Sequence, residues 1–256
     1  MIYFVGCSYT WGAGLQFELL SKRGWTASQI NDMIPPKTHL EHLDYECDEY
    51  RKKHHFPNLV AKEMDMAYGL GKVGNGGAND EISHLLNVGS IYTLGGEGQC
   101  KIIIIQFTDW TRSSQEYKNG MKDEYGQSLL NDNTINKIID KQIDSILDEV
   151  YTFGVGIKWF GLSWRNDLGL RLKQNYPNNF IPIYLNDKEY VSLEDTIVDD
   201  HTEFNTWHYE DKNNLRLSDT IHGVKDTHLS SIGHEVVAKS ILRKIKWLTS
   251  IKKMGI

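Results

Sequence analysis

The stretch Lys101–Gln106 contains four consecutive isoleucines, Ile102 to Ile105, and it constrains the fold more than any other part of the chain. A strand with one face in water alternates apolar and polar residues, so an unbroken β-branched run indicates burial on both faces. Central strands of parallel sheets have this property, because helices cover both faces of such a sheet. The run therefore predicts the central strand of a parallel sheet.

The rest of the chain alternates between strand and helix patterns, which predicts a parallel sheet with helices on both sides. Further strands are expected at Ile2–Val5, Tyr68–Val73, Val155–Leu162 and Phe180–Tyr184. Helices are expected at 15–20, 59–66, after Asn79, and at 135–151, 167–175 and 233–250. A length of 256 residues suits one domain, 1–256, with insertions near 21–56, 113–133 and 186–224. The first of these insertions is expected to have little core of its own and a short helix around 40–53.

Composition argues against several classes of protein. A net charge of -6 argues against a nucleic-acid surface, which would carry a basic field. No apolar run approaches the roughly 20 residues that a membrane span needs. Three cysteines form no disulfide framework. Because the first strand is expected to begin at Ile2, we expect no ordinary signal peptide and a cytoplasmic protein.

The segment Gly6-Cys-Ser-Tyr-Thr-Trp-Gly12 follows the first expected strand and introduces the first chemical feature. It sets Ser8 in a turn at the carboxyl end of a strand, where ligands bind in open α/β sheets. A hydroxyl held there is a nucleophile when a base lies nearby, and the backbone N–H of Ser8 can help to bind an oxyanion. The alternative is that Ser8 only caps the next helix.

Two further segments carry related chemistry. Asp226 and His228 precede the last expected helix. One interpretation is that they are the orienting carboxylate and the base of a Ser-His-Asp site. The alternative is that both only cap that helix. The turn Asn75-Gly-Gly-Ala-Asn79 offers free backbone N–H groups and an amide to a bound oxygen. A plain strand-to-helix turn is its alternative.

In this order, the three segments resemble the SGNH (GDSL) hydrolase superfamily. The resemblance implies that Ser8 is the nucleophile, Asp226 and His228 its partners, and Gly77 (alternatively Gly76) a backbone oxyanion donor. It further implies a flavodoxin-like three-layer α/β/α fold and an esterase that acts on an O-acyl ester, with a carbohydrate acetyl ester as a candidate. No metal or organic cofactor is needed for that reaction. The expected partner is a small-molecule or glycan ester, with no nucleic acid and no membrane.

The chain departs from the superfamily's pattern at three places. Cys7 stands where the family often has aspartate, and Asp226 and His228 are separated by one residue where two are commoner. The superfamily usually has an asparagine after the third strand of its sheet, whereas the isoleucine strand here ends Gln106-Phe-Thr-Asp109. Gln106 or Thr108 can donate a hydrogen bond instead, and Asn79 is a third candidate.

The missing asparagine motivates a rival hypothesis, a non-catalytic module on the same fold that binds carbohydrate or protein. A third hypothesis is a nucleotide- or flavin-binding domain. The glycines between Gly69 and Gly74 match the letters of a dinucleotide fingerprint, but they fall within or before the expected strand. Histidines and a cysteine between 39 and 55 match no compact metal motif, so a solvated loop is the expectation there: His39, His42, Cys47, His54 and His55.

Overall fold

The computed structural model describes residues 1–31, 45–71, 78–94, 100–110, 132–153, 156–185, 188–198 and 228–253. The chain divides into two compact units, and each unit is built from two separate stretches of the chain. Unit 1 comprises Met1–Cys7 and Ala67–Phe180. Unit 2 comprises Ser8–Met66 and Ile181–Ile256.

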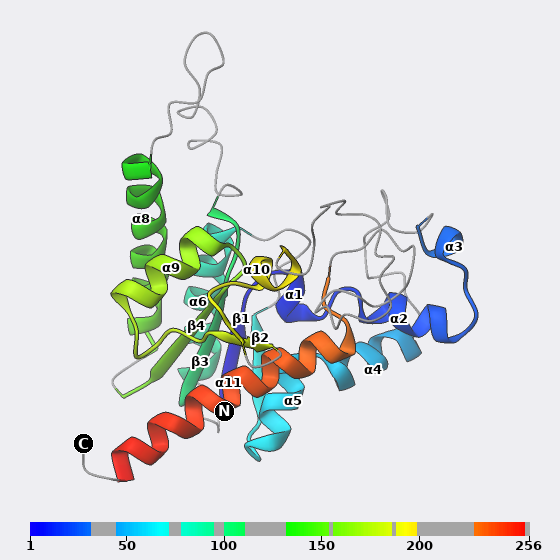
Figure 1. Ribbon diagram of the computed structural model, residues 1–256. Coiled ribbons are helices and arrows are strands. Elements are labelled where there is room, and N and C mark those ends of the chain that lie inside the picture. The colour runs from blue at the N-terminus through cyan, green and yellow to red at the C-terminus, as the bar shows by residue number, and fades with distance from the viewer. Residues whose placement is uncertain are drawn as a thin grey trace. The chain divides into compact units, whose positions relative to one another are not determined.

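Unit 1 contains a four-stranded, all-parallel sheet with the order β2-β1-β3-β4 (Figure 1). The strands are β1 (Ile2–Val5), β2 (Tyr68–Gly71), β3 (Ile102–Phe107) and β4 (Lys158–Ser163). This order, with the first strand between the second and the third, is that of flavodoxin-like α/β/α proteins. The predicted fold class, α/β with a parallel central sheet, is therefore confirmed.

The isoleucine run forms β3, and all six of its residues are buried, as are all four residues of β1. Side chains alternate between the two faces of a strand, so burial of every residue means that both faces are covered. The register aligns Ile2 of β1 with Ile102 of β3 and with Tyr68 of β2. The two strands that the sequence marks most clearly as apolar are thus the inner strands of the sheet.

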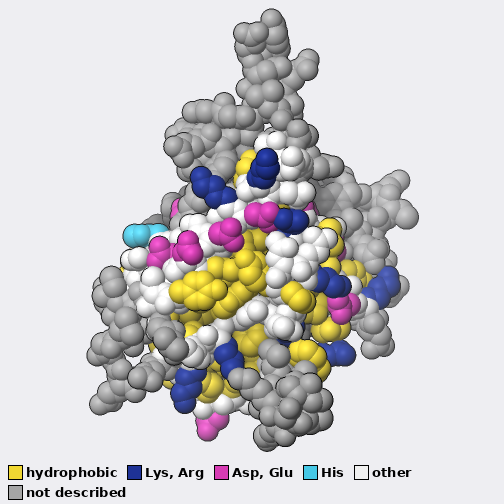
Figure 2. All heavy atoms as spheres, turned by 90° about the vertical axis from the view of Figure 1, so that its left-hand side faces the viewer, with side chains coloured by type: hydrophobic (Ala, Val, Ile, Leu, Met, Phe, Trp, Pro, Cys, Tyr) yellow, Lys and Arg dark blue, Asp and Glu magenta, His cyan; other side chains and the backbone are white. Residues whose placement is uncertain are grey.

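The helices of unit 1 are α6 (Asn79–Leu94), α8 (Asp132–Tyr151) and α9 (Asn166–Asn175). Helical spacing of apolar residues predicted α8, and five of those residues are buried: Ile139, Ile143, Ile146, Leu147 and Val150. The opposite face of α8 is polar. On the side of the molecule drawn in Figure 2, acidic side chains form a row next to apolar surface.

The strand predicted at Phe180–Tyr184 is only partly correct. Phe180 makes an isolated parallel bridge to Gly161, and β5 (Ile183–Leu185) instead pairs antiparallel with β6 (Lys188–Tyr190) in unit 2. Pro182 lies between the two pairings. Proline has no N–H to donate to a ladder, so the parallel pairing that begins at Phe180 cannot continue through it.

Unit 2 is mainly helical. Its helices are α1 (Ser8–Trp11), α2 (Leu15–Lys22), α3 (Ala27–Asn31), α4 (Tyr45–His54), α5 (Phe56–Glu63), α10 (Leu193–Val198) and α11 (Ser231–Lys253). The predicted lack of a core in 21–56 is wrong for the described part, because Ile30, Cys47 and Arg51 are buried. The other two predicted insertions lie mostly outside the described residues. Among the helices that are described, none has the length and apolar character of a membrane span.

Candidate active site

The segment with the predicted nucleophile begins unit 2. Only Gly6 and Cys7 separate the end of β1 from Ser8, which is the first residue of α1. The strand and the helix predicted at 15–20 are present as β1 and α2, but the segment that was predicted to be a turn contains the short helix α1, which begins at Ser8. The side chain of Ser8 lies outside the described residues, so its role stays a prediction.

The end of α1 is held by α4. The Arg51 guanidinium lies 3.7 Å from the centre of the Trp11 ring, and its Nη1 donates a hydrogen bond of 2.8 Å to the Trp11 carbonyl. Gly12 has a φ of +90°, and a β-carbon there would lie 2.9 Å from Cβ of His55. The turn after α1 therefore packs directly on buried side chains, and only glycine fits its conformation without strain.

The segment with the predicted base lies at the start of α11. His228 is half-buried, and it is followed by the buried residues Leu229 and Ser230. Ser230 caps α11, because its hydroxyl accepts a hydrogen bond of 3.0 Å from the N–H of Gly233. Asp226 lies outside the described residues.

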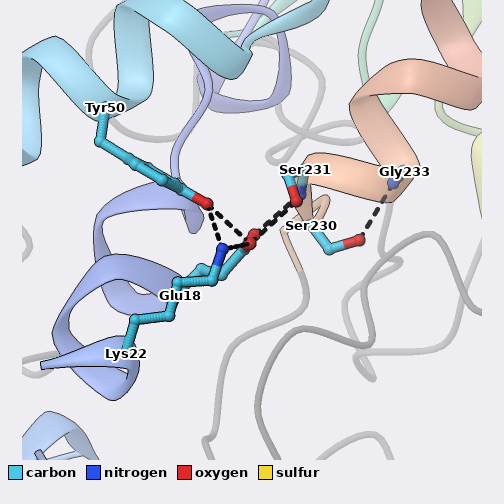
Figure 3. Close-up of polar contacts among 6 residues, drawn as sticks. All are labelled: Glu18, Lys22, Tyr50, Ser230, Ser231 and Gly233. Atoms are coloured by element: carbon cyan, nitrogen blue, oxygen red, sulfur yellow. Dashed lines mark hydrogen bonds and ion pairs between the residues drawn. The ribbon is translucent and has the colours of Figure 1, made fainter. Parts of the chain in front are cut away.

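Within unit 2, helix α2, which follows α1, contacts the amino end of α11, as Figure 3 shows. Glu18 of α2 accepts a hydrogen bond of 2.9 Å from the Ser231 N–H at Oε2 and one of 2.8 Å from the Ser231 hydroxyl at Oε1. Lys22 Nζ, at 2.6 Å, and the Tyr50 hydroxyl, at 2.8 Å, also donate to Oε1. The helix that follows the Ser8 turn is thus hydrogen-bonded to the amino end of the helix that follows His228.

The Glu18 carboxylate stays ionised despite its burial. Burial alone would raise the pKa of Glu18, but the hydrogen bonds from Lys22, from the Ser231 N–H and from Tyr50 together outweigh it and lower that pKa. The negative charge also lies at the amino end of α11, where a helix favours anions.

A buried histidine links α11 to a different helix, α5. The Phe56 N–H donates a hydrogen bond of 3.2 Å to Nδ1 of His234, which is fully buried. Burial lowers the pKa of His234 well below its usual value, and the nearby imidazoles of His55 and His228 lower it further. Burial and then the Arg51 charge lower the pKa of His55 to about 4. Both buried imidazoles are therefore neutral at pH 7.

Ser8, one predicted oxyanion donor, belongs to unit 2, whereas Asn79 and Gln106 belong to unit 1. Asn79 is the first residue of α6; its Oδ1 accepts a hydrogen bond of 2.9 Å from the Thr108 N–H, and its Nδ2 donates one of 2.7 Å to Gln142. Gln106, on β3, accepts a hydrogen bond of 3.3 Å from the Cys7 thiol. Gly77 lies outside the described residues. Asn79 and Gln106 are thus buried at the carboxyl ends of the strands, where Asn79 also ties β3 to α8.

Other residues singled out in the sequence have packing roles. Gly69 and Gly71 lie in β2, where a β-carbon at either position would come within about 3 Å of the Tyr3 side chain. Trp110 is buried, and its Nε1 donates to Asp167 of α9.

The solvated loop predicted around Cys47 and His55 is wrong, since each is only 1% exposed. His39 and His42 lie outside the described residues. Within the described parts of the chain, no group of three histidine, cysteine or acidic side chains is arranged to hold a metal ion.

Sequence reasoning gave no role to Glu18, Tyr50 or Ser231. One signal was present: Glu18 lies three residues after Leu15 and two before Leu20, so a charged residue occupies the apolar face of α2. A buried charge needs a hydrogen-bonding or charged partner. The sequence around Glu18 does not show which residue that partner is.

Comparison of the chain with protein-family models, with curated proteins and with solved structures finds no match.

Proposed function

We propose that this chain is a serine hydrolase of the SGNH type that cleaves an O-acyl ester, with Ser8 as nucleophile, His228 as base and Asp226 as its orienting carboxylate. The observation that carries the proposal is the contact between Glu18 and Ser231. A Ser-His-Asp site on this chain requires its first turn and the loop before its last helix to come together. That contact joins the helices next to both segments, within one unit.

The proposed reaction has two stages. His228 takes the proton of the Ser8 hydroxyl while the serine oxygen attacks the ester carbonyl; the resulting imidazolium then protonates the departing alkoxide, which leaves as an alcohol. Water, deprotonated by the same imidazole, then attacks the acyl-enzyme, and the acid leaves as Ser8 regains its proton. Asp226 holds the imidazole in the required tautomer.

The oxyanion is bound by hydrogen-bond donors aimed at the carbonyl oxygen. In this proposal the backbone N–H of Ser8 is one donor. The N–H of Gly77 and the amides of Asn79 and Gln106 remain predictions for the others. One hydrogen of the Asn79 amide goes to Gln142, so at most its second hydrogen is available.

The rival function, a binding module without turnover, is favoured by one observation. Asn79 is one candidate to replace the asparagine that the superfamily usually has after its third strand, yet its oxygen and its nitrogen both take part in hydrogen bonds of the fold. This rival predicts a folded protein in which the Ser8 hydroxyl does not react with an acylating or phosphonylating reagent.

A fluorophosphonate probe separates the two functions. The hydrolase proposal expects covalent labelling of the folded protein, its complete loss in Ser8→Ala, and a loss of roughly a thousandfold or more in rate in His228→Gln. Ser28→Ala on α3 and His84→Gln on α6 alter exposed residues of the same types, and both should label normally. Folded wild-type protein that stays unlabelled, or labelling that persists in Ser8→Ala, would overturn the proposal. A panel of acetyl, butyryl and longer p-nitrophenyl esters then defines the acyl group.

A further inference from the structure

We infer that Glu18 is a positioning residue for His228, and that it acts through Ser231 at the amino end of α11. The inference rests on the proposed hydrolase function, in which the imidazole of His228 must meet a serine that lies far away in the sequence. The hydrogen bonds between Glu18 and Ser231 join two helices that are far apart in the sequence, and Ser231 follows the proposed base by three residues.

Glu18 is anchored on its own side of the contact. Its side chain is 10% exposed, and Lys22 and Tyr50 both donate to its Oε1. Lys22 also donates to the Tyr50 hydroxyl at 2.5 Å, so the three side chains hold one another (Figure 3). A carboxylate in such a closed set has few alternative rotamers, and it presents its two oxygens to Ser231 in a fixed direction.

Ser231 passes that restraint on to His228. Only Leu229 and Ser230 separate the two residues; Leu229 is fully buried, and the Ser230 hydroxyl is tied to Gly233. The Ser231 N–H belongs to the first turn of α11, which has no intrahelical acceptor for it. Glu18 supplies that acceptor from α2. The backbone that enters α11 is therefore held at Leu229, Ser230 and Ser231, immediately after the proposed base.

A role for Glu18 as a proton donor or acceptor in the reaction fits the contacts less well. Its Oε1 already accepts three hydrogen bonds and its Oε2 one, and the carboxylate is held in the ionised form. Glu18 is suited to holding a helix end rather than to exchanging protons with a substrate.

The first test compares the kinetics of fluorophosphonate labelling in folded variants. Glu18→Ala should lower the maximal labelling rate by about tenfold to a hundredfold, because small displacements of a catalytic group are costly, and should leave the probe's half-saturating concentration unchanged. Glu18→Gln retains an acceptor for the Ser231 N–H, so it should restore most of the rate. Ser231→Ala removes only the hydroxyl bond and should cost about threefold. The double variant Glu18→Ala/Ser231→Ala should be no slower than Glu18→Ala, since both changes break one linkage.

The matched control is Glu63→Ala. Glu63 of α5 accepts a hydrogen bond of 3.0 Å from Lys246, so it also joins α11 to another helix, but at a point far along α11 from His228. This variant should label at the wild-type rate. A purely structural role for Glu18 would reduce the fraction of folded protein without changing the labelling rate of the folded molecules.

The second test needs no activity. Hydrogen exchange measured by mass spectrometry should show faster exchange at 228–234 in Glu18→Ala and not in Glu63→Ala. Unchanged exchange at 228–234 overturns the inference, as does an unchanged maximal labelling rate in a wild-type background that labels through Ser8. If the wild-type protein is not labelled at all, the hydrolase proposal itself fails, which is a distinct result. If Glu18→Ala does not fold, Ser231→Ala decides the matter: a rate loss with faster exchange at 228–234 supports the inference, and an unchanged rate overturns it.

Discussion

Gly12 and His55 touch so closely that a β-carbon on the glycine would lie 2.9 Å from Cβ of the histidine. The contact lies between the turn after α1 and the residue that joins α4 to α5. It makes the path of the chain after Ser8 depend on a side chain more than forty positions away, which leads to a first prediction.

Gly12→Ala should lower the free energy of unfolding by about 2–4 kcal/mol, of which about 1–3 kcal/mol comes from the positive φ and the rest from overlap with His55. Gly24→Ala is the matched control, because Gly24 has a φ of +88° and a β-carbon there would meet no atom within 4 Å. It should cost only the backbone strain. Urea titration of both variants measures the difference, and equal losses would mean that the crowding at His55 has no energetic weight.

The buried imidazole of His55 predicts a loss of stability in mild acid. Burial and the Arg51 charge lower its pKa from 6.5 to about 4, so between these values the unfolded chain binds a proton that the folded chain does not. The free energy of unfolding therefore falls as the pH drops from 6.5 to 4, by about 3 kcal/mol. Unfolding measured in urea at several pH values checks this.

His55→Gln should reduce that pH dependence, and the part that remains is expected from the buried His234, whose pKa is also lowered. His84→Gln, at an exposed position, is the control. Glu18 acts in the same direction but at lower pH. Its lowered pKa contributes stability that is present above the usual carboxyl value of 4.5 and is lost as the pH falls through the folded value. If the free energy of unfolding depends on pH above 5 in His55→Gln as it does in the wild-type protein, groups other than His55 cause the effect.

Asn79 should matter for stability whatever its part in catalysis. Asn79→Ala removes the partner of the Thr108 N–H and of the Gln142 amide in a buried setting, and it should cost about 3 kcal/mol. Asn87→Ala is the control, because the Asn87 amide also joins α6 to α8, through Glu149, but on the exposed surface. It should cost less than about 1 kcal/mol. Similar losses in thermal or urea unfolding would contradict the prediction, and the labelling rate of folded Asn79→Ala tests its oxyanion role separately.

The sheet was predictable because its information is local. Ile102–Ile105 and Ile2–Val5 are apolar without interruption, and burial on both faces leaves no other arrangement for them. The long helices α8 and α11 were predictable for the same reason, since their apolar residues recur at helical spacing. Boundaries moved by a few residues, which is the ordinary uncertainty of helix ends.

The contacts of the candidate site were not predictable, because they join residues that no local pattern relates. Glu18 and Ser231 are 213 positions apart. Nothing in the sequence around either residue indicates that the other is its partner. The short elements α10 and β6 were also missed, since both lie in a mostly polar stretch where neither period is visible. Pro182, by contrast, was visible in the sequence and could have ended the predicted strand at Phe180.

The distance along the chain between Glu18 and Ser231 has a consequence during biosynthesis. At roughly 5–20 residues per second, a ribosome needs about 10–40 s to travel from one to the other. For most of that interval α5, whose buried residues include Phe56, Val60 and Ala61, has been synthesised without α11, the helix against which it packs. Unit 2 therefore cannot be completed until α11 has been synthesised.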